Sequence, residues 1–513
     1  MISVDLVLAQ WASPYGIFLA VILLISIIPL TWFVYNVYFH PLAGFPGPLL
    51  HRGSMIPKIA TQLSGNITNK MTELHRIYGP VVRVAPSELS YTTVPAWKDI
   101  YTAGKDRQAM TVNTVYGRNE KEFFGACSIL WQSSNAEHAR HRRVLAPAFS
   151  EKALREHEPI ILHHIRLFIQ RMRENACKPV DLCAWFNFVS FDIIGDLTFG
   201  ESFDCLEQSK YHPWIWFIFG RLKMMMYSQV IDTLGILGTA IQMSIPQRIK
   251  DEVLGHVAYS REKISRRQEQ EKETGRRSDF MTHILRQVGE SKEKGMITHD
   301  ELVANAQILV MAGSETTATL LAAAAYYLMR NPQTQHRLER EIRSAFANEG
   351  EITAASTSGT SLPYLLAVLN EALRMHPPLP TGIHRIVPDG GAIIDGQFVA
   401  AGTDVIVHQW AAYRAPENFT DPDLFVPERW LPDASAGKYA GDNRDVFQPF
   451  SVGPRSCIGR SLAYIEARIV FVKLLWNFDM ELNPESKDWA DQKTWVVYEK
   501  LPLMARLTLA RRE

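Results

Sequence analysis

The segment Phe450–Gly459 (FSVGPRSCIG) places one cysteine, Cys457, where its sulfur could bind a metal ion. The following stretch, 460–472 (RSLAYIEARIVFV), has the apolar spacing of a helix, so Cys457 is predicted to lie just before a helix N-terminus. Free amide N–H groups and the partial positive charge at such an end lower the pKa of a thiol. Gly453 lets the backbone approach a flat ligand, and Arg455 offers a cation for an acidic group on it.

Phe450 and Gly459 complete the features of this loop. A phenylalanine ring can cover the sulfur and exclude water, and a second glycine lets amide N–H groups fold toward it. The alternative is a buried structural cysteine, the usual role of a free Cys. Five fixed positions at about one in twenty each give on the order of 10⁻⁴ chance matches in a chain of this length. The loop is therefore a candidate metal-binding thiolate site.

The sequence FSVGPRSCIG resembles the haem-binding loop of the cytochrome P-450 family, the haem-thiolate monooxygenases. The resemblance implies that Cys457 is the axial ligand of iron in haem b. A thiolate ligand pushes electron density onto iron and favours O–O cleavage, so the implied chemistry is activation of O2 rather than its storage. It also implies a mainly α fold, a large helical body with a minor β region, preceded by one N-terminal transmembrane helix.

A second motif, Ala312–Thr317 (AGSETT), lies inside a predicted helix from about Thr298 to Met329. Gly, Ser and Thr are poor helix formers, and a Thr hydroxyl can bond the carbonyl one turn back and open a local groove. The alternative is a tolerated weak stretch in a buried helix, because packing often overrides propensity. The motif matches the family's oxygen-binding pattern. This match implies that Thr316 delivers protons, that Glu315 is its acidic neighbour, and that Gly313 contacts the cofactor.

The resemblance also points to cations that would bind the haem propionates. His138 and Arg142 are spaced i, i+4 on one face of a predicted helix, and Arg385 follows a PPLP segment. Arginine suits this role because its planar fork grips a carboxylate through two hydrogen bonds. The family more often has Trp at the position of His138, so His is a departure. Ordinary surface arginines are the alternative, and His384 either binds a propionate or faces away.

A further cluster is predicted to be structural. Glu371 and Arg374 stand one helical turn apart in a mostly apolar stretch, so they are expected to be buried as a pair that needs a further partner. Arg429, in the segment PERW, resembles the family residue that completes this cluster. The three residues are expected to hold the haem-ligand loop in place.

The N-terminal region differs in composition from the rest of the chain. No Asp, Glu, Lys or Arg occurs between Asp5 and Arg52, and residues 17–37 are long and apolar enough to cross a bilayer. A cleaved signal peptide is the alternative, but a basic leading region and a small-residue cleavage site are both missing. We therefore predict a membrane anchor at 1–39 (span about 17–37), a proline-rich hinge at 40–50, and a haem-thiolate catalytic domain at 51–513. The positive charges that follow the span predict a cytosolic catalytic domain and single-pass attachment to the endoplasmic reticulum membrane.

Overall composition excludes several other classes. Lys+Arg and Asp+Glu are both 54, so no net charge would attract nucleic acid. The five cysteines are odd in number, irregularly spaced and form no CxxC pair, which argues against a disulfide framework or a zinc site.

These observations favour a membrane-anchored monooxygenase that hydroxylates a lipophilic small molecule. By resemblance, the substrate contacts come from 112–130, 214–231, 309–313 and 379–383. No Gly-rich nucleotide loop or flavin region is present, so electrons are expected from a separate NADPH-cytochrome reductase, with cytochrome b5 as a possible second donor. The residues around the motifs resemble those of filamentous-fungal family members that act in secondary metabolism, which suggests a terpenoid or polyketide substrate. A haem-thiolate isomerase or dehydratase and a non-enzymatic haem-binding protein are the alternatives; neither needs the pair Glu315 and Thr316.

Overall fold

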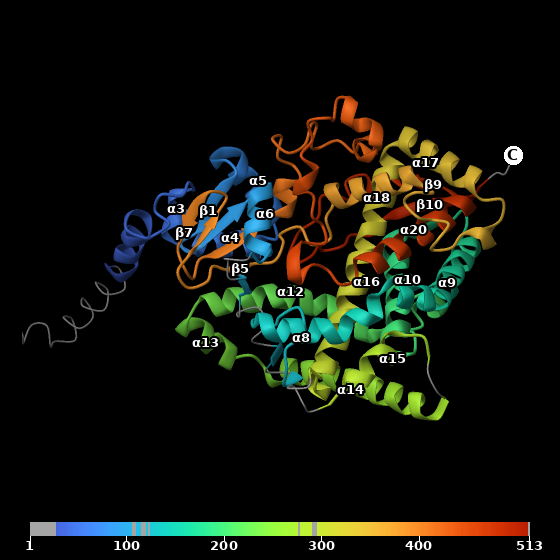
Figure 1. Cartoon of the computed structure of the whole chain (residues 1–513), viewed down its shortest axis with the longest axis horizontal. Helices are drawn as coiled ribbons and strands as arrows, with labels where there is room; N and C mark the ends of the chain where they lie inside the picture. Colours follow the sequence, from blue (N-terminus) through green and yellow to red (C-terminus); the bar gives the residue numbers. More distant parts are fainter. Residues whose placement is uncertain are drawn as a thin grey trace, which may run out of the picture.

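The computed structural model of the chain describes residues 27–104, 109–113, 120–121, 124–274, 277–289 and 295–510. This part forms a large helical body with a smaller β-rich region at one side, built from early and late segments of the chain (Figure 1). The predicted mainly α fold with a minor β region is confirmed.

The principal helices are α3 (Leu49–Gly53), α4 (Ile56–Ser64), α5 (Ile67–Tyr78), α6 (Val94–Tyr101), α8 (Asn135–Leu145), α9 (Glu151–Glu174), α10 (Leu182–Phe199), α11 (Cys205–Gln208), α12 (Pro213–Thr233), α13 (Ile236–Met243), α14 (Gln247–Thr274), α15 (Phe280–Ile284), α16 (His299–Arg330), α17 (Pro332–Ala345), α18 (Pro363–Met375), α19 (Gln409–Ala412) and α20 (Arg460–Asn477). The strands are β1 (Val81–Ala85), β2 (Glu88–Tyr91), β3 (Thr111–Val112), β4 (Pro179–Asp181), β5 (Arg385–Ile386), β6 (Ala392–Ile394), β7 (Gln397–Val399), β8 (Asp404–Val407), β9 (Phe478–Leu482) and β10 (Met504–Leu509).

The largest described sheet joins distant parts of the chain. Its strand order is β1-β2-β8-β5-β3. β1 and β2 are antiparallel, with Val82 opposite Ser90, whereas β2 runs parallel to β8, with Leu89 opposite Val405. A second sheet has the order β4-β10-β9, and β6 pairs with β7. The β-rich region therefore forms only after the early and late segments have met.

Helices α10 and α16 form the centre of the helical body and pack along each other. α10 (LCAWFNFVSFDIIGDLTF) is apolar around nearly its whole circumference, a pattern typical of a helix that is buried on all sides. α16 begins with a capping box, in which the Thr298 hydroxyl accepts from the amide of Glu301 and the Glu301 carboxylate accepts from the amide of Thr298. Both helices are long and apolar enough to span a bilayer, but 94% and 78% of their most apolar windows are buried inside the protein. They are core helices.

The local predictions for the site-bearing helices agree with the structure. The apolar periods at 363–375 and 460–477 are α18 and α20, and the helix predicted from about Thr298 is α16 with Thr298 as its N-cap. These elements have strong local signals, namely apolar periodicity, caps and flanking prolines.

The described end of the predicted anchor is an apolar helix, Ile27–Tyr38; the rest of the predicted span lies outside the described residues. Ile28, Leu30 and Trp32 on this helix are more than half exposed. Its last turn docks onto α3, because the Arg52 guanidinium donates to the carbonyl of Val37 at 2.9 Å and the Asn36 amide donates to the carbonyl of Gly53 at 3.2 Å. The apolar helix thus meets the body through its C-terminal turn.

One buried carboxyl group links stability to pH. Glu466 of α20 is 2% exposed, and its Oε1 accepts a hydrogen bond of 2.7 Å from the hydroxyl of Ser190 on α10. Burial raises the pKa of Glu466 to about 8, which the bond from Ser190 only partly opposes. The group therefore stays protonated in the folded protein at neutral pH.

Glu466→Gln is expected to make the protein more stable than wild type at pH 8 and to change little at pH 5. Between pH 4.5 and 8 the unfolded chain loses the carboxyl proton and the folded one keeps it, so wild-type stability falls by up to about 1.4 kcal/mol per pH unit. Gln still offers a side-chain carbonyl oxygen that can accept from the hydroxyl of Ser190, and it has no carboxyl group to titrate. Thermal unfolding from pH 5 to 8 measures the difference, with exposed Glu269→Gln as the control. A difference between wild type and Glu466→Gln that does not grow with pH would contradict this assignment.

Candidate active site

A cavity of about 370 Å³ lies between α16, the loop before α20, and the β-rich region. All the residues predicted for the site except Gly453 line it: His138, Arg142, Gly313, Glu315, Thr316, Arg385, Phe450, Arg455, Cys457 and Gly459. Most other lining side chains are apolar. The fold thus gathers residues from four separate segments around one cavity.

Cys457 projects into the cavity from a tight loop. The amide of Cys457 donates to the carbonyl of Phe450 at 2.8 Å, which closes the loop two residues before α20 begins. Burial raises the pKa of the Cys457 thiol, and the amide groups of Gly459 and Arg460 together with the charge of Arg142 oppose that rise. The sulfur remains exposed to the cavity. These amides and charges are the groups that would stabilise a thiolate at this position.

The two glycines of the flanking motifs serve close packing. Gly453 has φ +76°, and a Cβ there would lie 2.2 Å from the carbonyl oxygen of Tyr101 at the end of α6. A Cβ on Gly313 would lie 2.7 Å from the Cδ1 of Ile194 on α10. Gly453 therefore requires glycine, because its neighbour is backbone, whereas a side chain at position 313 would have to displace the end of the Ile194 side chain. For Gly453, the structure gives a contact with α6 in place of the predicted position at the cavity wall.

Three guanidinium groups and one imidazole meet at one end of the cavity. Arg142 donates to the carbonyl of Ser456 at 2.7 Å, and Arg455 donates to the side-chain oxygen of Asn135 at 3.0 and 3.2 Å. Arg385 packs over the ring of Tyr101, 5.0 Å from its centroid. Among the described residues, none of the three arginines has a carboxylate within ion-pair distance. Within the described residues, Asp404 acts on Arg385 only from beyond ion-pair distance, so no carboxylate is bound to any of the three cations.

Electrostatics at this end favour an anionic ligand. Burial and the charge of Arg385 lower the pKa of Arg455 to about 10. Burial and the charges of Arg455, Arg142 and Arg385 lower the pKa of His138 to about 3, so this imidazole is neutral. Buried cations without partners are unfavourable, and a ligand with acidic groups would remove that penalty. A flat dicarboxylate such as haem fits the combination of these arginines with a cysteine facing the same cavity.

The AGSETT motif forms part of the cavity wall on α16. The hydroxyl of Thr316 donates to the carbonyl of Ala312 at 2.6 Å, as the sequence predicted, and Thr317 donates to Gly313 at 2.9 Å. α16 is continuous through the motif, so the predicted local groove is not seen as a break in the helix. Thr316 lines the same cavity as Cys457, which comes from the loop before α20.

Glu315 has a partner that the sequence did not reveal. Its carboxylate forms an ion pair of 3.1 Å with Lys500, whose ammonium group also donates to the side chain of Asn187 at 3.0 Å and to the backbone carbonyl of Glu315 at 3.1 Å. Both charged side chains are largely buried. Lys500 follows Glu499 in an otherwise apolar stretch near the C-terminus, and nothing local in the sequence links it to α16.

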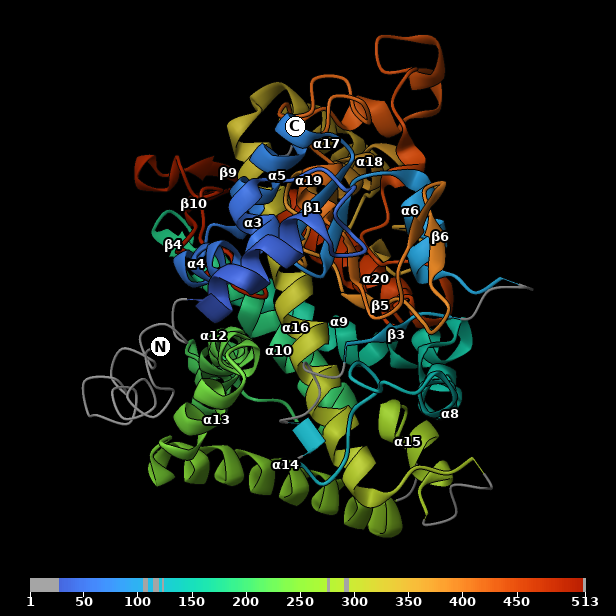
Figure 2. The same cartoon turned by 90° about the vertical axis from the view of Figure 1, so that its left-hand side faces the viewer.

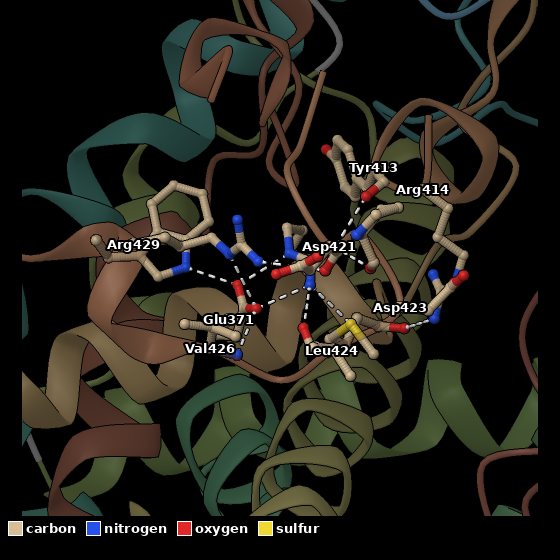
Figure 3. Close-up of polar contacts among 12 residues, drawn as sticks. Glu371, Tyr413, Arg414, Asp421, Asp423, Leu424, Val426 and Arg429 are labelled. Atoms are coloured by element: carbon tan, nitrogen blue, oxygen red, sulfur yellow. Dashed lines mark hydrogen bonds and ion pairs between the residues drawn. The ribbon is translucent and has the colours of Figure 1, made fainter. Parts of the chain in front are cut away.

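The predicted Glu371 cluster is present and fully buried (Figure 3). Arg374 donates to both carboxylate oxygens of Glu371, at 2.8 and 2.9 Å, and Arg429 donates to one of them at 3.1 Å. Burial works to raise the pKa of Glu371, but the charges of Arg374 and Arg429 outweigh it and lower the pKa. Arg429 also pairs with buried Asp442, a partner that the sequence analysis missed.

A chain of hydrogen bonds connects this cluster with the cysteine loop. Arg374 donates to the backbone carbonyl of Tyr413 at 2.9 Å, and the hydroxyl of Tyr413 accepts from the amide of Gln448 at 2.9 Å (Figure 3 shows Tyr413 beside the cluster). Gln448 lies two residues before Phe450. The cluster therefore has a direct route by which to fix the start of the loop that carries Cys457.

The predicted substrate segments supply much of the apolar lining. From these segments come Val112, Ile129, Leu130, Met225, Met226, Gln229, Leu309, Met311, Ala312, Leu379, Thr381, Gly382 and Ile383. Parts of 112–130 lie outside the described residues. Trp214 does not take part: it is 5% exposed and stacks on His256, with ring centroids 4.4 Å apart. Gln62 of α4 and the loop residues Trp495, Val496 and Val497 also line the cavity, although they lie outside the predicted segments.

The structure also shows where the side chain of His384 lies. Its ring lines the cavity, and its Nδ1 lies 2.8 Å from the carboxylate of Asp404 on β8. Asp404 also accepts from the amide of Asn113 at 2.9 Å. The ring is thus anchored to the sheet rather than to the arginines.

Comparisons with known proteins extend over almost the whole chain. Residues 45–506 match the family model described as Cytochrome P450. Cytochrome P450 monooxygenase astA from Talaromyces wortmannii is 41% identical over 478 residues, which cover 92% of this chain and 93% of that protein. Cytochrome P450 monooxygenase efuB from Hormonema carpetanum is 41% identical over 486 residues, covering 93% and 94%. A trichothecene C-4 hydroxylase from Trichoderma arundinaceum is 40% identical over 495 residues, covering 95% and 96%.

Proposed function

The chain belongs to the cytochrome P450 family, and on that premise we propose which of its residues hold the haem, move protons and select the substrate. The protein is an oxidoreductase, a haem-dependent monooxygenase that inserts one oxygen atom from O2 into a lipophilic small molecule. Membership of this family leaves no place for the non-enzymatic alternative.

We assign Cys457 to the haem iron and Arg142, Arg385 and Arg455 to the haem propionates. Haem ligated by a thiolate supplies activation of O2. The loop amides and Arg142 keep the sulfur as a thiolate, and Phe450 limits access of water to it. Among the described residues no carboxylate lies within ion-pair distance of the three arginines, which supports their assignment to two carboxylates.

We assign proton delivery to Thr316 and Glu315. The hydroxyl of Thr316 faces the cavity and can hold a water molecule while it donates to Ala312. Glu315 is the residue before Thr316 on the same helix, and its carboxylate forms an ion pair with Lys500. A proton can pass from this acid through water to Thr316. The presence of both groups supports the oxygenase over an isomerase or dehydratase, which needs neither.

The observation that carries the proposal is the placement of Cys457, from the loop before α20, and Thr316, from α16, in one cavity with a mainly apolar lining. Three measurements test it on the purified full chain. The dithionite-reduced, CO-bound spectrum reports thiolate ligation, and reductase-dependent consumption of O2 reports oxygenase chemistry. A product that gains one oxygen atom reports insertion. A thiolate-type spectrum without reductase-dependent O2 consumption would instead favour the isomerase.

The substrate is proposed to be a terpenoid or polyketide of fungal secondary metabolism. The relative named trichothecene C-4 hydroxylase hydroxylates a compound of that general kind, and the cavity here is lined mainly by aliphatic and methionine side chains. Such a lining suits a hydrocarbon skeleton rather than a charged metabolite. Candidate compounds can be screened by the change in haem spectrum on binding.

Electrons are proposed to come from a separate NADPH-cytochrome reductase, with cytochrome b5 as a second donor. The membrane is proposed to be that of the endoplasmic reticulum, crossed once, with the catalytic domain in the cytosol. The exposed apolar helix Ile27–Tyr38 supports attachment to lipid. Exposed Trp216, Leu237 and Met243 on α12 and α13 offer a second apolar contact with the bilayer surface.

Deletion of Met1–Tyr38 is expected to move the protein from the membrane pellet toward the soluble fraction while haem binding survives. The deletion removes the apolar helix and with it the main hydrophobic contact with lipid. Some membrane affinity should remain through the apolar surface on α12 and α13. Ultracentrifugation and the haem spectrum check the two parts of the prediction.

A second deletion, Met1–Thr31, is the matched control because it leaves the contacts of Asn36 and Val37 with α3 in place. Both deletions should release the protein to a similar extent. Loss of haem in the longer deletion alone would show that the last turn of the helix belongs to the catalytic domain. Loss of haem in both would contradict an anchor role.

A further inference from the structure

Two glutamine side chains, Gln62 of α4 and Gln229 of α12, interrupt the apolar part of the cavity wall. Gln62 is only 7% exposed. Among the described residues, neither side-chain amide takes part in a hydrogen bond, although both face the cavity. Gln229 is half-buried, and polar side chains that face a mainly apolar cavity without a protein partner are suited to bind a polar group of a ligand.

Several other polar side chains of the wall have partners within the protein. Glu315 is held by Lys500, and His384 by Asp404. The side-chain oxygen of Gln409 lies 3.4 Å from the hydroxyl of Tyr413. The proposed haem contacts account for the arginines. Gln62 and Gln229 thus remain available for a different molecule in the same cavity.

The two glutamines lie at one end of the cavity. α4 and α12 pack against each other, and the amide of Thr494 donates to the carbonyl of Gly65 at the end of α4 at 2.7 Å. The neighbouring ring of Trp495 lies 6.0 Å from that of Tyr227 on α12. In both views α4 and α12 lie on one side of α16, and α20, which follows Cys457, lies on the other (Figures 1 and 2). The helices that carry the two glutamines therefore lie on the other side of α16 from the helix that follows Cys457.

The charges around the glutamines favour a neutral group. Lys58, one turn before Gln62 on α4, is buried and already paired with Glu88. Among the described cations near the end of α4, Lys223 is paired with Glu499 and Lys493 is exposed to solvent. An amide, in contrast, can both donate to and accept from a hydroxyl or carbonyl oxygen. We propose that Gln62 and Gln229 bind a neutral oxygen function, a hydroxyl, ketone or lactone carbonyl, at the end of the substrate remote from the carbon that is oxidised.

This assignment rests on the proposed function and narrows its substrate class. The skeleton that reaches the enzyme already carries one oxygen function, and anchoring it sets which distant carbon lies nearest the thiolate side of the cavity. A reaction that leaves a hydroxyl or carbonyl on the skeleton must therefore come before this one. The glutamines act on the position of the substrate, so they affect KM and regioselectivity more than the chemical step.

The test measures binding of three matched pairs of probes to the full-length haem-loaded protein by equilibrium dialysis. The pairs are valencene and nootkatone, dodecane and 1-dodecanol, and naphthalene and 2-naphthol. The variants are Gln62→Met and Gln229→Met, which keep the side-chain length and remove the amide. Met226→Leu, an apolar change in the same wall, is the control.

Wild type is expected to bind the oxygenated member of at least one pair more tightly than the hydrocarbon. Each Gln→Met change should weaken binding of that member by about 2- to 10-fold and leave the hydrocarbon unchanged, as expected for one lost neutral hydrogen bond. Met226→Leu should keep the wild-type ratio of affinities between the oxygenated and the hydrocarbon member of each pair. Each fold-change compares two protein variants with the same probe, so partition of that probe into detergent cancels.

The proposal is overturned if wild type prefers the oxygenated member of no pair, or if both variants keep the wild-type ratio. The CO-bound spectrum of each protein separates this failure from a failure of the proposed function. A thiolate-type spectrum with an unchanged ratio removes the glutamine assignment alone. Absence of that spectrum in wild type removes the haem-thiolate assignment itself.

Discussion

Cys457→Ser is expected to abolish turnover and to eliminate the thiolate-type spectrum of the reduced, CO-bound protein. Serine has no ionised soft ligand to offer at neutral pH, and the amides of Gly459 and Arg460 that favour a thiolate cannot make a hydroxyl equivalent to it. The change removes little volume, and Cys457 already faces the cavity. The fold should therefore remain, as far-UV circular dichroism would report.

Cys177→Ser is the matched control, because Cys177 is an exposed free cysteine outside the cavity. It should keep both the spectrum and the activity. Haem retained by Cys457→Ser through Arg142 and Arg455 would be consistent with the assignment, provided that the thiolate signature is lost. A normal thiolate-type spectrum in Cys457→Ser would show that another residue ligates the iron.

Thr316→Ala is expected to separate consumption of NADPH from formation of product. Cleavage of the O–O bond requires protons at the right moment, and Thr316 is the hydroxyl on α16 that faces the cavity beside Glu315. Without it, reduced cofactor should still be oxidised while electrons leave as hydrogen peroxide. A proton-transfer role of this kind is typically worth about 10²–10⁴ in rate. The measurement is product formed per NADPH oxidised, with reductase and a turned-over substrate.

Thr319→Ala provides the control for a lost helix hydroxyl. Thr319 also donates to a carbonyl one turn back, that of Glu315 at 2.8 Å, but it is buried and does not line the cavity. It should leave coupling unchanged, and both variants should bind haem. Coupling in Thr316→Ala equal to that of wild type would remove Thr316 from the mechanism and reopen the isomerase hypothesis.

The sequence by itself determined the local parts of this enzyme. The thiolate loop at Cys457, the helix that follows it, and the motif around Thr316 all have signals within about ten residues, so their types and bounds could be read directly. Helix periodicity, caps and short motifs depend on neighbours in the chain, and that is why these predictions agree with the structure.

The partners of the site residues were decided by the tertiary structure. Lys500 pairs with Glu315, Asp442 with Arg429, and Gly453 approaches Tyr101, all across long distances in sequence. A lone lysine or aspartate carries no local mark of the charge that it will meet. Such pairings are selected by burial, because an ionised group removed from water is stable only beside its counter-charge.

The shape of the cavity near α4 also depends on contacts between segments that are distant in sequence. Gln62 and Trp495 reach the cavity only because α4 and the loop near Thr494 are bonded together at Gly65. Trp214, in contrast, has the apolar neighbours of a lid residue yet is buried against His256. Apolar sequence indicates that a side chain will leave water, but the surface that covers it is set by the packing of distant helices.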